Sequence, residues 1–286
     1  MKSNNPVFAR SEEFNRASYN AYGNQTYPGA GTTHEGYGDP SAWGTGTPGQ
    51  VDTGRMTIDS AVQKTAISIA VVFATAFATW WLIGDIVESG NLVNEEAAGR
   101  AGLLGMVGAG AAFLLSLVNS FKRVISPALV LAFAAAEGLA LGANSKFFDA
   151  QFGDGIVTNA VLGTFAALAG TLAAYKFFDI KVGAKFRTFV IAGMFGMVGL
   201  CLLSLVLSLF GIQTGLFGFG TLGFIMAVVG LVLGVFMLIL DLDFIENGVA
   251  AGIPERESWR AAFGITVSLV WIYTNLLRIL AIFSQD

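Results

Sequence analysis

Charged residues, histidine and cysteine are all scarce in this chain of 286 residues. Only 13% of the residues are charged whereas 54% are hydrophobic, and this balance excludes an ordinary soluble domain. A single Cys excludes an internal disulfide and a CxxC site, and a single His excludes a zinc site built from several histidines. The net charge of -4 gives no electrostatic basis for binding nucleic acid. The composition therefore indicates a membrane protein, and we expect neither a metal site nor a cofactor.

The first 60 residues differ sharply from the rest of the chain. Residues 18–54 are mostly Gly, Ser, Thr, Asn, Pro and Tyr, with hardly an aliphatic side chain. Such a segment cannot bury enough apolar surface to offset the entropy lost on ordering. We therefore predict a disordered cytoplasmic tail over residues 1–60, in which His34 has no role, followed by a transmembrane domain over residues 61–286.

Seven apolar runs follow the tail, and each is near the roughly 20 residues that a helix needs to cross a bilayer. The runs are continuous rather than alternating, which excludes the strands of a membrane β-barrel. The second and third runs are short and are interrupted by Gly, Ser or Glu, so they are the weaker signals. We predict an all-α polytopic membrane protein, a bundle of seven transmembrane helices. The runs are residues 66–84, 102–118, 128–143, 156–175, 189–212, 217–240 and 261–283.

Basic residues gather in the loops at one end of this predicted bundle. That end carries ten Lys and Arg residues, whereas the other end carries only Arg100 and Lys146. Cytoplasmic loops are enriched in Lys and Arg, so we expect a cytoplasmic N-terminus and, after seven crossings of the cell membrane, a C-terminus outside. The ten residues are Arg55, Lys64, Lys122, Arg123, Lys176, Lys181, Lys185, Arg187, Arg256 and Arg260.

Two ionisable residues lie deep in apolar runs, where a charge is costly unless it is paired or hydrated. Glu137 is ten residues after Pro127, about 15 Å into the third run. It is either a carboxyl that locks the bundle or a group on a cation or proton path. Arg278 lies in the last run and either snorkels to the outer surface or pairs with a carboxylate, for which Glu137 and Asp241 are the candidates.

Two more carboxylates close the sixth run, in the string LILDLDFIENG. Asp241 and Asp243 are two residues apart, so they point to nearly opposite sides of a helix and cannot face the same site. One is expected to face the bundle and the other to face water or headgroups. We interpret Asp243 as a solvated residue at the helix end and Asp241 as the functional one, because it directly follows an uninterrupted apolar run.

Catalytic motifs are missing from the sequence. It contains no GxSxG, no HExxH and no GxxxxGK[ST], and no His is placed to act as a general base. An intramembrane aspartyl protease would need a second catalytic Asp on a facing helix, and no later run supplies one. We therefore do not expect an enzyme.

Three segments resemble the Bax inhibitor-1 family: SPALVLAFAAAEGLALGANSKFF (Ser126–Phe148), DLDFIENGVAAGIPERESWRAAFG (Asp241–Gly264) and LVWIYTNLLRILAIF (Leu269–Phe283). The start of the chain, Ser3–Phe8, is similar to that of the bacterial branch of this family, which implies a bacterial inner membrane. The resemblance implies a seven-helix bundle with a central last helix that acts as a pH-sensitive calcium leak.

The resemblance also implies a latch, in which an Asp of the sixth helix and an Asp of the seventh share a proton and pair with an Arg of the second. Asp241 matches the first Asp. Asn275 stands where the second Asp is expected, and the second run contains no Arg. Asn does not titrate, so the two-carboxylate sensor is absent in its usual form. Our hypothesis is a rewired latch formed by Asp241, Glu137, Asn275 and Arg278.

Two function classes remain open at this stage. The first is a passive calcium leak, since Ca²⁺ prefers hard oxygen ligands such as carboxylates. The second is a regulator without transport activity that binds another membrane protein, such as a membrane-anchored protease, because long disordered tails often dock partners. Deleting residues 1–55 separates the two, since a leak survives the deletion and a regulator that acts through the tail does not.

Overall fold

Seven helices long and apolar enough to cross a membrane make up the part of the chain that the structure, a computed structural model, describes. The described residues are 54–88, 92–153, 155–178 and 180–285. The predicted disordered tail therefore lies almost wholly outside them, as does His34. The helices are α2 (Ile58–Ile83), α3 (Glu95–Phe121), α4 (Pro127–Phe152), α5 (Ile156–Phe177), α6 (Ala184–Leu209), α7 (Thr221–Ala251) and α8 (Ser258–Phe283).

The predicted seven-helix bundle is confirmed, with two corrections to the lengths of its helices. The second and third apolar runs lie in helices of 27 and 26 residues, as long as the others. The residues added to α3 include Glu95, Glu96 and Arg100, all exposed at the start of the helix, so the second helix does contain an Arg outside the apolar run. The sixth run does not end near Asp241. Helix α7 continues for another ten residues to Ala251, so both Asp241 and Asp243 lie inside a helix.

Local sequence signals explain where several helices begin and end. Thr57 and Ser60 form a capping box at the start of α2. The Asn94 side chain accepts a hydrogen bond from the backbone N–H of Ala97 at the start of α3. Pro127 occupies the first turn of α4, where no N–H is needed. Gly252 ends α7 in the left-handed conformation (φ 63°) that glycine adopts without strain.

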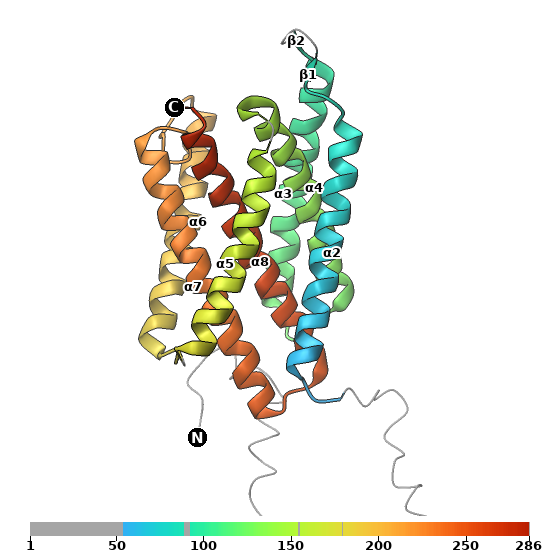
Figure 1. The fold of residues 1–286 in the computed structure, drawn as a ribbon, viewed down its shortest axis with the longest axis vertical. Coiled ribbons are helices and arrows are strands. Elements are labelled where there is room, and N and C mark those ends of the chain that lie inside the picture. The colour runs from blue at the N-terminus through green and yellow to red at the C-terminus, as the bar shows by residue number, and fades with distance from the viewer. Residues whose placement is uncertain (1–53, 89–91, 154, 179, 286) are drawn as a thin grey trace, which may run out of the picture.

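The short connections place successive helices in opposite directions. A two-stranded hairpin, β1 (Val87–Glu88) with β2 (Leu92–Val93), joins α2 to α3, and a short 3-10 helix, η2 (Glu255–Glu257), joins α7 to α8. Figure 1 shows that α2 begins at one end of the bundle and that α8 finishes at the other. We call these the N-terminal end and the C-terminal end. The N-terminal end carries the ten basic residues that the sequence places together.

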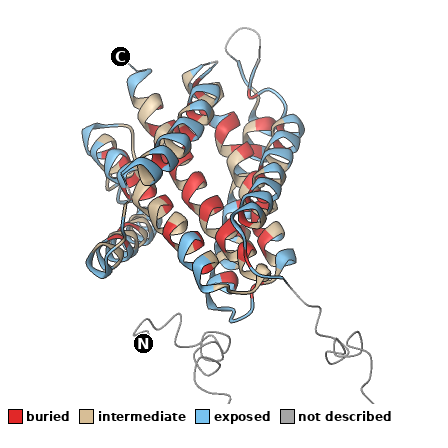
Figure 2. Ribbon diagram, turned by 60° about the horizontal axis from the view of Figure 1, so that its bottom comes forward, coloured by how far each residue is buried: buried red, intermediate tan, exposed pale blue. Residues whose placement is uncertain are grey.

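Helix α8 is the central element of the bundle. It crosses the middle of the molecule in Figure 1 and contacts α2, α4, α5 and α7. Of the apolar span that contains α8, 56% is buried, whereas 11% of the α6 span is buried. Buried residues accordingly gather toward the inside in Figure 2, and exposed ones cover the outer helices. The two other helices that carry candidate residues, α4 and α7, therefore pack against α8.

Small residues set the closest contacts between helices. A Cβ atom on Gly138 or Gly142 of α4 would collide with α2, and one on Gly230 would collide with the Asn275 side chain of α8. Such contacts hold helices together in lipid, where apolar surface provides no driving force for association. The glycines of α6 take part less, because Gly193 meets Leu233 while the positions of Gly196 and Gly199 open onto free space.

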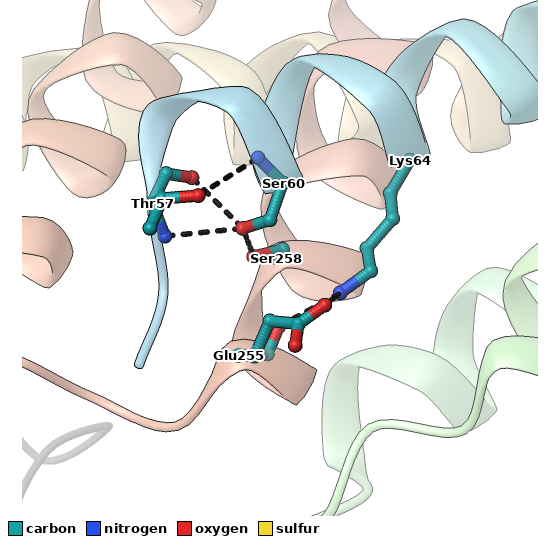
Figure 3. Close-up of polar contacts among 5 residues, drawn as sticks. All are labelled: Thr57, Ser60, Lys64, Glu255 and Ser258. Atoms are coloured by element: carbon teal, nitrogen blue, oxygen red, sulfur yellow. Dashed lines mark hydrogen bonds and ion pairs between the residues drawn. The ribbon is translucent and has the colours of Figure 1, made fainter. Parts of the chain in front are cut away.

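The start of α2 is bonded to the connection between α7 and α8, at the N-terminal end (Figure 3). The Lys64 ammonium pairs with Glu255 at 2.7 Å, and the hydroxyls of Ser60 and Ser258 are 2.7 Å apart. Just before them, the backbone N–H of Met56 donates to the carbonyl of Ile253 at 2.8 Å. We call the contacts between residues 54–64 and 253–258 the clasp. The last residues of the predicted tail are thus fixed to the bundle.

Candidate functional site

Asp241 lies on α7 at its contact with α8. Its Oδ2 accepts a hydrogen bond of 2.6 Å from the hydroxyl of Ser268. Gly264, one turn before Ser268 on α8, makes room for the carboxylate, because a Cβ there would lie 2.5 Å from Asp241 Oδ1. A bond to an ionised carboxylate is about twice as strong as a neutral one. The two residues on α8 therefore form a cradle for Asp241, which we call the Asp241 cradle.

Asp243 points away from this cradle, as the two-residue spacing predicts, but it is not solvated. It is 7% exposed, and its Oδ2 accepts a hydrogen bond of 2.8 Å from the Arg187 guanidinium of α6. The interpretation of Asp243 as a solvated helix end is thus wrong, because α7 continues past it and α6 covers it. The ion pair fastens the outlying helix α6 to α7.

Glu137 lies on the face of α4 that packs against α8. Four residues before it, the Phe133 ring meets the Phe263 ring with centroids 4.9 Å apart, and eight residues after it, the Ser145 hydroxyl lies 2.6 Å from that of Tyr273. Residues at these spacings share one helix face. Glu137 is partly exposed, and among the described residues it has no hydrogen-bonding or ion-pair partner.

The two carboxylates Glu137 and Asp241 lie at about the same depth in the bundle. Helices α4 and α8 run in the same direction, so Glu137 falls near the level of Thr266, midway between Gly264 and Ser268. Asp241 contacts α8 at those two residues from the α7 side. Helix α8 therefore stands between two carboxylates at about one level of the bundle, which the sequence alone does not reveal.

Asn275 and Arg278 lie further along α8, toward its C-terminal end. The Asn275 amide donates to the Trp271 carbonyl at 2.8 Å and rests on Gly230 of α7. It is seven residues beyond Ser268, or about 10 Å along the helix. The structure thus places Asn275 on the face of α8 that packs against α7. Asp241 contacts the same face, but two turns away from Asn275.

Arg278 has backbone carbonyls as partners rather than a carboxylate. Its Nη2 donates to the carbonyls of Gly223 and Leu216 at 3.2 and 3.4 Å, and its guanidinium lies 5.3 Å from the centroid of the Phe217 ring. Arg278 is ten residues beyond Ser268, about 15 Å along α8. In the described contacts it pairs with neither Glu137 nor Asp241, so the four residues of the predicted latch do not form one cluster.

Three residues of the site were missed by the sequence interpretation. Gly264 and Ser268 are four residues apart in the last apolar run, a spacing typical of a helix contact, and this signal could have identified them. Arg187 was counted only as a basic residue that sets orientation, because nothing local shows that it reaches Asp243. No group of three or more His, Cys, Asp or Glu residues suited to a metal occurs in the described ranges.

The whole helical domain also matches a known family. A model described as Bax inhibitor 1 like matches residues 5–285, nearly the full length of the chain. The chain belongs to the Bax inhibitor 1 like family. No curated protein matches it. Membership in the Bax inhibitor 1 like family confirms the resemblance that Ser126–Phe148, Asp241–Gly264 and Leu269–Phe283 suggest. It also agrees with seven apolar helices in a multi-pass membrane protein in contact with lipid.

Proposed function

We propose that this protein is a pH-sensitive calcium leak whose latch is the Asp241 cradle. The observation that carries the proposal is the Asp241 carboxylate, held inside the bundle by Ser268 of the central helix at 2.6 Å. A carboxylate at membrane depth is a functional candidate by default. Carboxylate oxygens are also the ligands that Ca²⁺ prefers. Membership in the Bax inhibitor 1 like family supports the same function.

The chemistry of the latch follows from the two protonation states of Asp241. An ionised carboxylate only accepts hydrogen bonds, so it accepts one from the Ser268 hydroxyl and ties α7 to α8. A protonated carboxyl is neutral and carries a donor of its own, so the contact with Ser268 loses its charge-assisted character. Helix α8 is then less firmly held against α7. In this mechanism the contact between two helices changes with pH without a second carboxylate at Asn275.

Glu137 provides the second oxygen group of the proposed path. It lies near the depth of Asp241 on the α4 side of α8 and remains partly exposed. A cation that passes along the α4 side of α8 would therefore meet the Glu137 carboxylate, with Asp241 at the same level on the α7 side. Arg278 lies about 15 Å beyond Ser268, toward the C-terminal end, and its role in the proposal is to hold the connection before α7 through the Leu216 and Gly223 carbonyls.

The orientation of the bundle is part of the proposal. The N-terminal end, which carries the ten basic residues, faces the cytoplasm of a bacterial cell, because positive loops are retained on that side. The C-terminal end then faces outward.

Calcium flux from liposomes tests the proposal. The parent protein is expected to dissipate a calcium gradient at a rate that changes between mildly acidic and mildly alkaline pH. Asp241→Asn is expected to show the acidic rate at every pH, because the amide is neutral like the protonated acid. Asp59→Asn removes an exposed carboxylate in the first turn of α2 and is expected to behave as the parent. An unchanged pH response in D241N would refute the latch.

The clasp favours a second function, a regulator that binds another membrane protein. Residues 1–53 lead directly into Gly54, whose carbonyl accepts a hydrogen bond of 2.6 Å from the N–H of Glu255. A partner bound to the tail would therefore pull on the connection between α7 and α8. Deleting residues 1–53 retains the clasp and removes only the tail. Loss of a partner's regulation in cells with the calcium flux intact would identify the tail as the regulatory part.

A further inference from the structure

An apolar cavity of about 230 Å³ lies between α2, α4, α5 and α8. It extends along α2 from Ile69 to Trp80, which is about 16 Å at the rise of an α-helix. Val161 of α5 and Leu269 of α8 line its sides. The cavity is therefore long and narrow, and it lies beside α8 on a different face from the one that carries the Asp241 cradle.

The walls of this cavity are mostly apolar, and the hydroxyl groups in them are already hydrogen-bonded within the protein. The Thr164 and Thr266 hydroxyls each donate to a carbonyl of their own helix at 2.7 Å, and the Ser145 and Tyr273 hydroxyls bond to each other. A cavity with apolar walls stays dry, because a water molecule needs two or more polar partners. The cavity is thus suited to an apolar occupant and is separate from the proposed calcium path.

The cavity opens toward the bilayer between α2 and α5. Phe73, Phe77 and Phe165 line it and are nevertheless 45%, 75% and 42% exposed. The rings of Phe73 and Phe165 stack across the opening with centroids 6.0 Å apart. Because these helices lie in the membrane, the exposed sides of the three rings touch lipid chains. An acyl chain can therefore reach the cavity without leaving the hydrocarbon.

A positive charge marks the end of the cavity nearest the membrane surface. The Lys146 ammonium lies 4.7 Å from the centroid of the Trp80 ring, which lines the cavity, and pairs with Asp85 at 3.0 Å. The Lys146 side chain is 10% exposed and the Asp85 side chain is 82% exposed, so the ammonium is open to headgroups only from the side that Asp85 occupies. A phosphate that displaces the exposed Asp85 can therefore accept a hydrogen bond from this ammonium.

We propose that the cavity binds one acyl chain of a bilayer phospholipid, with the phosphate of that lipid beside Lys146. The chain would lie against Leu269 of α8 and would replace the missing packing between α2 and α5. This assignment concerns a lipid-binding site and does not depend on calcium conduction.

Two adjacent tryptophans allow a direct test in vesicles of phosphatidylglycerol with brominated acyl chains, which quench tryptophan fluorescence on contact. Trp80 lines the cavity, whereas Trp81 is 78% exposed and reports the surrounding lipid. The contribution of each is the difference between the parent protein and Trp80→Phe or Trp81→Phe. Both tryptophans are expected to be quenched in the parent protein.

Filling the cavity separates the bound chain from the surrounding lipid. Val161→Phe is expected to lower the quenching of Trp80 at least twofold and to leave Trp81 unchanged. Leu162→Phe, on the neighbouring residue that is 62% exposed, is expected to change neither. If V161F does not fold, Val157→Phe fills the same cavity one turn away. Equal Trp80 quenching in the filled variant and in L162F would overturn the proposal.

Discussion

Ser268 and Asp241 join the central helix α8 to α7 through a hydrogen bond of 2.6 Å between a hydroxyl and a carboxylate. Along the chain, the last ten residues of α7 and the short helix η2 lie between Asp241 and the start of α8. In the proposed mechanism, the protonation state of Asp241 decides how firmly α7 and α8 are held together. The relationship differs from the predicted pairing of Asp241 with Arg278, which the described contacts do not contain.

Ser268→Ala removes the donor and leaves the Asp241 carboxylate without it. Losing a hydrogen bond to a charged group costs about 2 kcal/mol, so the variant is expected to unfold at a lower temperature in detergent. Its calcium flux should respond to pH over a different range from that of the parent. The matched control is Ser208→Ala, which removes an exposed hydroxyl bonded within α6. Identical pH profiles for S268A and the parent would exclude Ser268 from the latch.

Gly264→Ala tests the other half of the cradle. The added Cβ would lie 2.5 Å from Asp241 Oδ1, so either the carboxylate or the helix must move. Overpacking of this kind costs about 1–3 kcal/mol and is expected to appear as a lower unfolding temperature with an altered flux. Gly196→Ala meets no atom within 4 Å and should be neutral or slightly stabilising. Equal unfolding temperatures of the two variants would show that the Asp241 cradle can accommodate a Cβ atom at position 264, which would contradict the close packing.

Glu137→Gln removes the charge on the α4 side of α8 and keeps the shape of the side chain. If Glu137 provides an oxygen ligand on the path, the calcium flux is expected to fall several-fold at each pH, because a neutral amide attracts Ca²⁺ less strongly. The ratio of acidic to alkaline flux should be retained, since Asp241 is untouched. Liposome flux measured side by side with D241N distinguishes conduction from gating. A flux equal to that of the parent would remove Glu137 from the path.

Arg187→Gln breaks the ion pair that fastens α6 to α7. Leaving a buried charge unpaired costs about 3–5 kcal/mol, but Arg187 is 36% exposed, so we expect about 1–3 kcal/mol here. Proteolysis of the connection between α5 and α6 should become faster. Lys185→Gln, an exposed cation two residues earlier in the same helix, is the control. Equal cleavage rates in the two variants would contradict a fastening role for the pair.

Arg278→Gln distinguishes the latch predicted from the sequence from the proposed latch, the Asp241 cradle. Arg278 binds the carbonyls of Leu216 and Gly223, so its loss is expected to loosen the connection between α6 and α7 and to speed hydrogen exchange there. The pH response of the calcium flux should be retained, because Asp241 is about 15 Å away along α8. A pH response lost in R278Q as fully as in D241N would restore Arg278 to the latch.

Much of the fold was predictable because the bilayer leaves few alternatives. A segment of about 20 apolar residues must satisfy its own backbone hydrogen bonds in lipid, and the helix does so. The seven helices therefore follow from the runs of residues, and the odd number of crossings follows from their count. The lengths of α3 and α4 were underestimated, because charged residues such as Arg100 and Lys146 lie in the helix ends beyond the apolar runs, where the apolar signal has already stopped.

The candidate site was predictable as a set of residues but not as a set of contacts. Asp241, Asp243, Glu137 and Arg278 stand out because charge in an apolar run is costly. Their partners are not adjacent in the sequence: Asp243 pairs with Arg187, 56 residues away, and Asp241 with Ser268, 27 residues away. Spacing along one helix gives the direction of a side chain and carries no information about which helix lies opposite.

The sequence by itself thus determined the class of the protein, its seven helices and the few polar residues inside the membrane. These follow from each segment's own transfer from water to lipid, which is a local property. Only the tertiary structure decided that Ser268 and Gly264 hold Asp241, and that Arg278 binds carbonyls instead. Helices in lipid associate through close packing and polar contacts, so the partners depend on how small residues such as Gly230 let two helices approach.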